Sequence, residues 1–187
     1  LKVRVRVGRS LPQPISLAEL HRAVTFAQGI SWTIILTLTF SGLRLSEFCN
    51  LKASSLVGDA VALRVTGKGS KERVIAIPPT LYGILSAHSE RKTGFLFGGQ
   101  KRGTSIHPNT VYHHLAELGR LVGIPDLHPH RLRHTYATWL YAVTKDPFYV
   151  ANQMGHGSMT TTMGYAGLVT PPVGITTMED LMKWVMV

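Results

Sequence analysis

Residues 30–48, "ISWTIILTLTFSGLRLSEF", join an apolar run directly to a charged segment. The apolar run ends near Phe40 and is shorter than the roughly 20 residues that cross a bilayer, so we expect a helix of a globular core. Gly42 then breaks the helical pattern, and Arg44 stands at the start of a new helix, with Glu47 three residues further on the same face. The stretch therefore predicts a core helix that ends beside a charged helix start.

The composition is strongly basic. The 187 residues, enough for one good core, include 20 Lys and Arg against 10 Asp and Glu, a formal net charge of +10. This imbalance is typical of a protein that meets a polyanion, with nucleic acid ahead of an anionic membrane surface. The single cysteine, Cys49, excludes an internal disulfide and is expected to be a buried small hydrophobe in a reduced compartment. We expect a soluble, cytoplasmic protein, because the sequence shows neither a signal peptide nor a membrane span.

The overall pattern predicts a mainly α fold with a small antiparallel β-sheet or hairpin (α+β). Ser16 and Glu19 have capping-box spacing, which starts a helix running to about Ala27. Two β-rich runs, residues 60–65 and 73–77, flank the turn "TGKGSKE", which carries Lys68 and Lys71. Further helices are expected over 109–122, 129–143, 147–154 and from Thr176 and Glu179 onward.

The segment "HPHRLRH", residues 128–134, concentrates histidine and arginine at a predicted helix start. Pro129 suits the first helical turn and places His130, Arg133 and His134 on neighbouring positions of one face. His130 and His134 have metal-ligand spacing, but the adjacent arginines would repel a cation and no second cysteine exists, so we expect no metal ion. A phosphate site and a solvated basic stripe both remain open on this segment alone. The opposite face, Leu132, Tyr136, Trp139 and Leu140, should belong to the core.

A second cluster, "MGHGSMTTTMGY" at 154–165, decides between these interpretations. Together with "GLRLSE", "GKGSKER" and "HPHRLRH", in this order, it resembles the catalytic domain of the tyrosine recombinases, the phage integrases and Xer-type recombinases, over about residues 12–170. The resemblance implies a site-specific DNA recombinase that serves mobile elements or similar DNA. Such an enzyme cleaves and rejoins strands through a 3′-phosphotyrosyl intermediate with a free 5′-hydroxyl, and needs no cofactor, metal or ATP.

The resemblance also implies the catalytic residues. Tyr165 matches the nucleophile, and Arg44 and Arg133 match the arginines that hold the non-bridging phosphate oxygens. Lys68 matches the general acid that protonates the departing 5′ oxygen. Lys71 is a rival for that role, and Lys68 is preferred because glycines flank it.

Two histidines and one acid complete the implied site. His130 matches the histidine that assists proton transfer from the tyrosine, and His156 matches the residue that hydrogen-bonds the phosphate. Glu47 resembles the acidic partner that orients Arg44 or His130. We expect DNA contacts from Lys71, Arg73 and Arg131. His128, Arg131 and His134 are left outside the catalytic set, as groups for phosphate-backbone contact, capping or packing.

The expected organisation has three parts. Residues 1–14 form an extended segment or linker, 15–170 the catalytic domain, and 171–187 a connector and a final helix, for which docking in cis and in trans on a neighbouring protomer stay open. We expect the N-terminal DNA-clasping domain of the family to be absent from this chain. The implied partners are double-stranded DNA and further copies of the chain, a tetramer on DNA, without a membrane. Three alternatives remain: a type IB topoisomerase-like enzyme, a DNA-binding module inactive without the absent domain, and, least favoured, a metal-dependent hydrolase.

Overall fold

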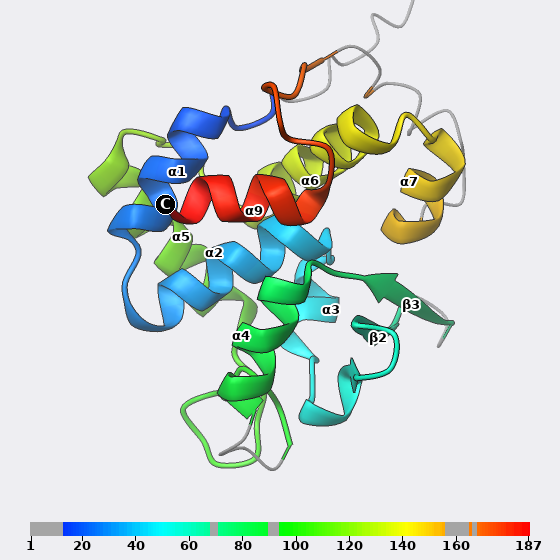
Figure 1. Ribbon diagram of the computed structural model, residues 1–187. Helices are drawn as coiled ribbons and strands as arrows, with labels where there is room; N and C mark the ends of the chain where they lie inside the picture. The colour runs from blue at the N-terminus through cyan, green and yellow to red at the C-terminus, as the bar shows by residue number, and fades with distance from the viewer. Residues whose placement is uncertain (1–12, 68–70, 90–93, 156–164, 166–167) are drawn as a thin grey trace, which may run out of the picture.

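Helices and a small sheet make up the fold (Figure 1). The computed structural model describes residues 13–67, 71–89, 94–155, 165 and 168–187. The order is α1 (Leu17–Phe26), α2 (Gly29–Ser41), α3 (Leu45–Cys49), η1 (Ala53–Ser55), β1 (Leu56–Val57), β2 (Ala62–Thr66), β3 (Glu72–Ala76), α4 (Pro79–Ser89), α5 (Pro108–Val122), α6 (Pro129–Thr144), α7 (Pro147–Met154) and α9 (Met178–Met186). The predicted fold class, mainly α with a small antiparallel sheet, is confirmed.

Helix α2 lies at the centre of the molecule, with α1, α4, α5 and α6 around it (Figure 1). Every residue from Thr33 to Ser41 is buried, as the apolar run predicts. The buried hydroxyls of Thr37 and Ser41 are satisfied within the helix, since they donate to the carbonyls four residues earlier. Within the described ranges, no helix combines the length and apolar character that a bilayer crossing needs.

The helix boundaries follow the predicted signals closely. Ser16 and Glu19 form the predicted capping box of α1. The predicted helices at 109–122, 129–143 and 147–154 correspond to α5, α6 and α7. For α9 the box is one residue later than predicted, because Thr177 and Asp180 form it. Glu179 instead accepts hydrogen bonds from the backbone and side chain of Thr80 on α4.

The sheet has the strand order β1-β2-β3, with both pairs antiparallel. The predicted hairpin corresponds to β2 and β3, where Val65 pairs with Arg73 and Thr66 with Glu72. Strand β1 and helix α4 were not predicted. Strand β3 contacts helix α7.

Helix α9 closes the bundle on its own chain. Its apolar stripe, Leu181, Met182 and Val185, is fully buried in the main core. The helix contacts α1, α4 and α6 (Figure 1). In this single chain the stripe therefore packs in cis.

Gly42 ends α2 in the left-handed conformation, with φ at +61°, and a Cβ there would lie 2.2 Å from Cδ1 of Tyr136. We predict that Gly42→Ala lowers the free energy of unfolding by at least about 3 kcal/mol, because backbone strain and overlap with a buried ring add. Gly29 has φ at +55° and open space where a Cβ would lie, so Gly29→Ala is the matched control, with a loss of about 1 kcal/mol. Urea denaturation followed by circular dichroism measures both; equal losses would contradict the packing argument.

Candidate active site

Arg44 stands at the N-terminus of α3, immediately after the Gly42 turn. Its backbone N–H donates to Glu47 Oε2 at 2.8 Å, and Nη1 of its side chain lies 3.0 Å from Glu47 Oε1. Its Nη2 donates to the carbonyl of Gly155 at 2.9 Å. The side chain is 41% exposed, so it reaches the surface while its position is fixed from two sides.

Glu47 joins two arginines. Its side chain is only 2% exposed, and it also accepts from Nη1 and Nη2 of Arg73, at 2.6 and 2.9 Å. Arg73 further donates to the carbonyl of Gln153. Burial opposes ionisation of the carboxyl, but the hydrogen bonds from Arg73 and Arg44 outweigh it and hold the pKa of Glu47 below its usual value. Glu47 therefore remains a carboxylate inside a cluster of cations.

Arg133 lies deeper than Arg44, at 6% exposure. Its guanidinium donates to the carbonyl of Gly42, at the end of α2, and to that of Met154, at the end of α7. The last carbonyls of a helix lack intrahelical partners and carry the negative end of the helix dipole, so they suit a buried cation. Burial, with repulsion from Arg44, lowers the pKa of Arg133 to about 10, which leaves it charged at neutral pH.

Tyr165 lies against α6. Its ring is 2% exposed and packs in a small second core with Tyr136, Ala137, Leu140, Val150 and Met154. Its Oη lies 3.0 Å from Nδ1 of His134, and Nε2 of His134 lies 2.9 Å from Nε2 of His130. Burial raises the pKa of Tyr165, and the nearby charge of Arg133 opposes this effect.

A cavity of about 330 Å³ opens beside the two arginines and His130. Arg44, His130 and Arg133 line it, together with Tyr112 of α5 and the first residue of α6. The cavity thus brings together two guanidiniums and an imidazole from separate segments of the chain. An anion with several oxygens, such as a phosphodiester, fits this donor set.

Arg44 also borders a second hollow, of about 440 Å³, on the side of the β2–β3 turn. Lys71 lines it, and so do Gly67 and Gly155, the neighbours of Lys68 and His156. Lys68 and His156 themselves lie outside the described residues, so their predicted roles stay predictions. Their flanking residues border the same strip of surface as Arg44.

The residues predicted to contact DNA differ in their surroundings. Lys71 is exposed. The guanidinium of Arg73 is bound to Glu47, and that of Arg131, at 9% exposure, to Asp126 and the carbonyl of Gln13. In this structure both arginines therefore serve internal ion pairs.

His128 and His134, which were not predicted to be catalytic, make different contacts. His128 caps α6, because its Nδ1 accepts from the backbone N–H of Arg131 at 3.2 Å, in line with the capping interpretation. His134 instead contacts the predicted nucleophile, which was not anticipated. Its spacing of four residues from His130 was the available signal, but only the position of Tyr165 reveals its partner.

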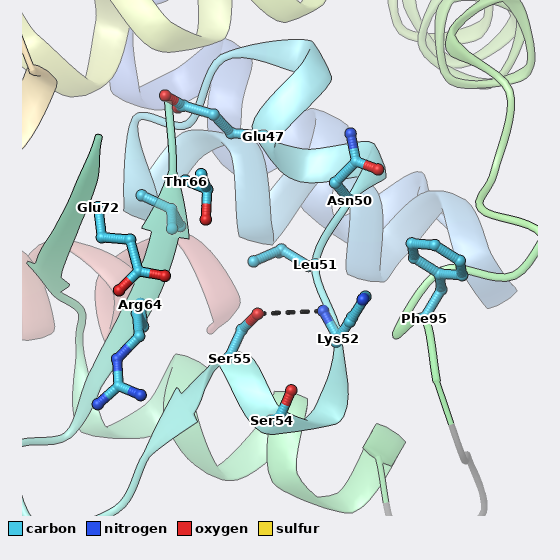
Figure 2. Close-up of a pocket in the computed structure, with 11 residues that line it drawn as sticks. Glu47, Asn50, Leu51, Lys52, Ser54, Ser55, Arg64, Thr66, Glu72 and Phe95 are labelled. Atoms are coloured by element: carbon cyan, nitrogen blue, oxygen red, sulfur yellow. Dashed lines mark hydrogen bonds between the residues drawn. The ribbon is translucent and has the colours of Figure 1, made fainter. Parts of the chain in front are cut away.

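A separate hollow of about 450 Å³ lies between α3, η1 and β2 (Figure 2). Lys52, Arg64 and Glu72 are among its lining residues, and Figure 2 shows the carboxylate of Glu47 at its margin, away from Lys52. Neither Tyr165 nor any of the histidines of α6 lines this hollow. Among the residues that the structure describes, no group of three or more His, Cys, Asp or Glu side chains is arranged to hold a metal ion.

A family model and curated relatives both match this chain to phage integrases and tyrosine recombinases. The model of the phage integrase family matches residues 18–169. The chain is 32% identical to the tyrosine recombinase XerC of Mesorhizobium japonicum, over 88% of this chain and 58% of that protein. It is 36% identical to the tyrosine recombinase XerA of Pyrococcus furiosus, over 86% and 59%. The chain thus spans about three fifths of the length of these curated relatives.

Solved structures share the fold. A crystal structure of XerA recombinase superposes with a TM-score of 0.72 at 25% identity, covering 84% of this chain and 61% of that one. XerH site-specific recombinase bound to a palindromic difH substrate gives a TM-score of 0.73 at 22% identity, covering 87% and 52%.

Glu47 provides a test of how the arginine cluster is held. We predict that Glu47→Gln lowers the free energy of unfolding at pH 7 by about 3 kcal/mol, because Arg73 loses a buried counter-charge. Since folding lowers the pKa of Glu47, its stabilisation is fully present above the unfolded value near 4.5 and is lost as the pH falls through the folded value. Urea denaturation at pH 7 and pH 3 measures this.

The difference in the free energy of unfolding between wild type and Glu47→Gln should therefore be smaller at pH 3 than at pH 7. The matched control is Glu117→Gln, an exposed acid on α5 whose partner is His113, which should change stability by less than about 0.5 kcal/mol. A difference for Glu47→Gln that is the same at both pH values would contradict the ion-pair argument.

Proposed function

The chain belongs to the phage integrase family, and we propose that it is the catalytic part of a tyrosine-type site-specific DNA recombinase. The observation that carries the proposal is that His130 lines one cavity with Arg44 and Arg133. His130 is connected through His134 to the hydroxyl of Tyr165. This set supplies an oxygen nucleophile, imidazole bases and fixed cations, which are the groups that phosphodiester transfer requires.

The proposed reaction begins with attack of Tyr165 Oη on the scissile phosphorus. The phosphorus–O5′ bond breaks, a 3′-phosphotyrosyl bond forms, and the 5′ oxygen leaves with a proton from Lys68. Arg44 and Arg133 stabilise the charge that builds on the non-bridging oxygens, because a guanidinium donates several N–H bonds in a fixed plane. His156 adds a further hydrogen bond to the phosphate.

The second step reverses the first with a different 5′-hydroxyl. The phosphotyrosyl bond conserves the energy of the phosphodiester, so exchange needs neither ATP nor a metal ion. The fixed charges of Arg44 and Arg133 take the place of a divalent cation and would repel one. Attack by a hydroxyl from another duplex gives recombination, and return of the original strand gives relaxation.

The proposed partners are double-stranded DNA and further copies of the chain. Exchange between two duplexes needs four cleavages, so we propose a tetramer on DNA, which acts in the cytoplasm at the nucleoid. The DNA-bound state of XerH in its solved structure supports the DNA partner. The formal charge of +10 does so independently.

Tyr165→Phe tests the chemistry. The full chain is incubated in EDTA with a library of nicked suicide duplexes of randomised sequence, and covalent protein–DNA bands are recorded on denaturing gels. We expect a band with wild type and none with Tyr165→Phe, because the phenyl ring offers no nucleophile. Tyr82→Phe, on the distant helix α4, is the control and should keep the band.

Three results would contradict the proposal or narrow it. A band that persists in Tyr165→Phe places the nucleophile elsewhere. Activity that EDTA abolishes favours a metal-dependent hydrolase. Relaxation of supercoiled DNA without joining of two duplexes favours a type IB topoisomerase.

The salt dependence of DNA binding tests whether the proposed interface is dominated by contacts to phosphate. With about four phosphates neutralised, the affinity for duplex DNA should fall at least about 100-fold between 50 and 200 mM salt. Lys71→Gln should reduce the slope of log affinity against log salt by about 1, since its exposed ammonium borders the hollow beside Arg44. Fluorescence anisotropy measures both, and an affinity that is flat across this range would exclude a phosphate-dominated interface.

A further inference from the structure

Tyr165 has His134, and not His130, as its hydrogen-bond partner on α6. The distance from Oη to Nδ1 of His134 is 3.0 Å, and the chain continues with 2.9 Å between the two Nε2 atoms of His134 and His130. The two imidazole rings meet edge to face, at 81° with their centroids 4.3 Å apart. The order Tyr165, His134, His130 is thus fixed by geometry.

The positions of Tyr165, His134 and His130 are fixed by helix α6 and by the packing around it. His130 and His134 are four residues apart and share one face of α6. His134 is 8% exposed and Tyr165 is 2% exposed, so bulk solvent has little access to the phenol. The small core between α6 and α7 fixes the Tyr165 ring against the helix.

The phenol needs a base within reach. Burial raises the pKa of Tyr165, so at neutral pH the oxygen still carries its proton when attack begins. Imidazole is the side chain best suited to accept a proton near neutral pH. His130 lies one hydrogen bond further away than His134 does.

We propose that His134 is a catalytic residue, the base that takes the proton of Tyr165, and that His130 is the second group of a two-histidine relay. This inference rests on the proposed function, because it assigns a role within the same reaction. It adds a group to the catalytic set that the sequence motif did not supply.

The proton path balances with the strand transfer. A proton on Nε2 of His134 donates to Nε2 of His130 and leaves the lone pair of Nδ1 facing Oη. As the bond from Oη to phosphorus forms, the phenolic proton moves to Nδ1, and the Nε2 proton of His134 moves to His130. The leaving 5′ oxygen receives a separate proton from the general acid. In the second step the same path runs backwards and returns a proton to the departing phenol.

The kinetic test uses single-turnover formation of the covalent adduct by the full chain. Both His134→Gln and His134→Asn should slow it at least about 100-fold, the usual effect of losing a general base. His114→Gln is the matched control, because His114 is partly buried and is likewise bonded to a hydroxyl, that of Ser31, but lies on α5. It should leave the rate unchanged.

A second arm separates proton transfer from positioning. Replacing Tyr165 by 3,5-difluorotyrosine makes the phenol more acidic, so a missing base matters less. We expect this replacement to speed the His134 variants at least about tenfold more than the wild type. The proposal would be overturned if 3,5-difluorotyrosine changed the rate equally in wild type and in the His134 variants. It would also be overturned if the His134 variants reacted at the wild-type rate.

A third arm needs no DNA and no folded His134 variant. In ¹⁵N-histidine-labelled protein, the Nδ1 resonance of His134 should differ between wild type and Tyr165→Phe, since the phenol bonds to that nitrogen. Identical resonances would overturn the contact. Absence of any adduct with wild type would count against the proposed function, while this comparison would still test the His134 contact separately.

Discussion

The site depends on keeping several guanidiniums close together in a protein that is already strongly basic. Arg44 and Arg133 repel each other, and this repulsion contributes to the lowered pKa of Arg133. The buried carboxylate of Glu47 offsets it by bonding Arg44 on one side and Arg73 on the other. Glu47 is thus a structural counter-ion, which leaves Arg44 charged and partly exposed toward an incoming anion.

Carbonyl groups at the C-terminal ends of two helices also offset the repulsion between Arg44 and Arg133. Gly42 and Gly155 end α2 and α7 in the left-handed conformation, both with φ at +61°. The carbonyls around these two ends accept from the guanidiniums of Arg133 and Arg44. Because unpaired carbonyls at a helix C-terminus carry partial negative charge, the two ends orient the arginines without a further acid that would compete with phosphate.

The sequence predicts well whatever depends on local signals. The capping box of Ser16, Pro129 at the start of α6 and Gly42 after α2 each act within a few residues, and the structure confirms the elements that they predict. Helix α4 is not predicted, because two successive prolines, Pro78 and Pro79, are typical of a turn, whereas in the structure Pro79 is the first residue of the helix. The box of α9 was placed one residue early, since Thr176, Thr177, Glu179 and Asp180 offer two overlapping boxes and only the contact of Glu179 with Thr80 selects one.

Local signals do not predict contacts between segments that are far apart in the sequence. Arg73 is separated from Glu47 by 26 residues, and an arginine beside a predicted turn gives no sign that a buried carboxylate will face it. Likewise His134 and Tyr165 are 31 positions apart in the sequence, so no local signal indicates their contact. The motif names residues by type and order, whereas which imidazole reaches the phenol is set by the helical face and by the packing of α7 against α6. The two histidines of this helix turn accordingly differ in their surroundings: His134 contacts Tyr165, whereas His130 lines the cavity with Arg44 and Arg133 and contacts His134.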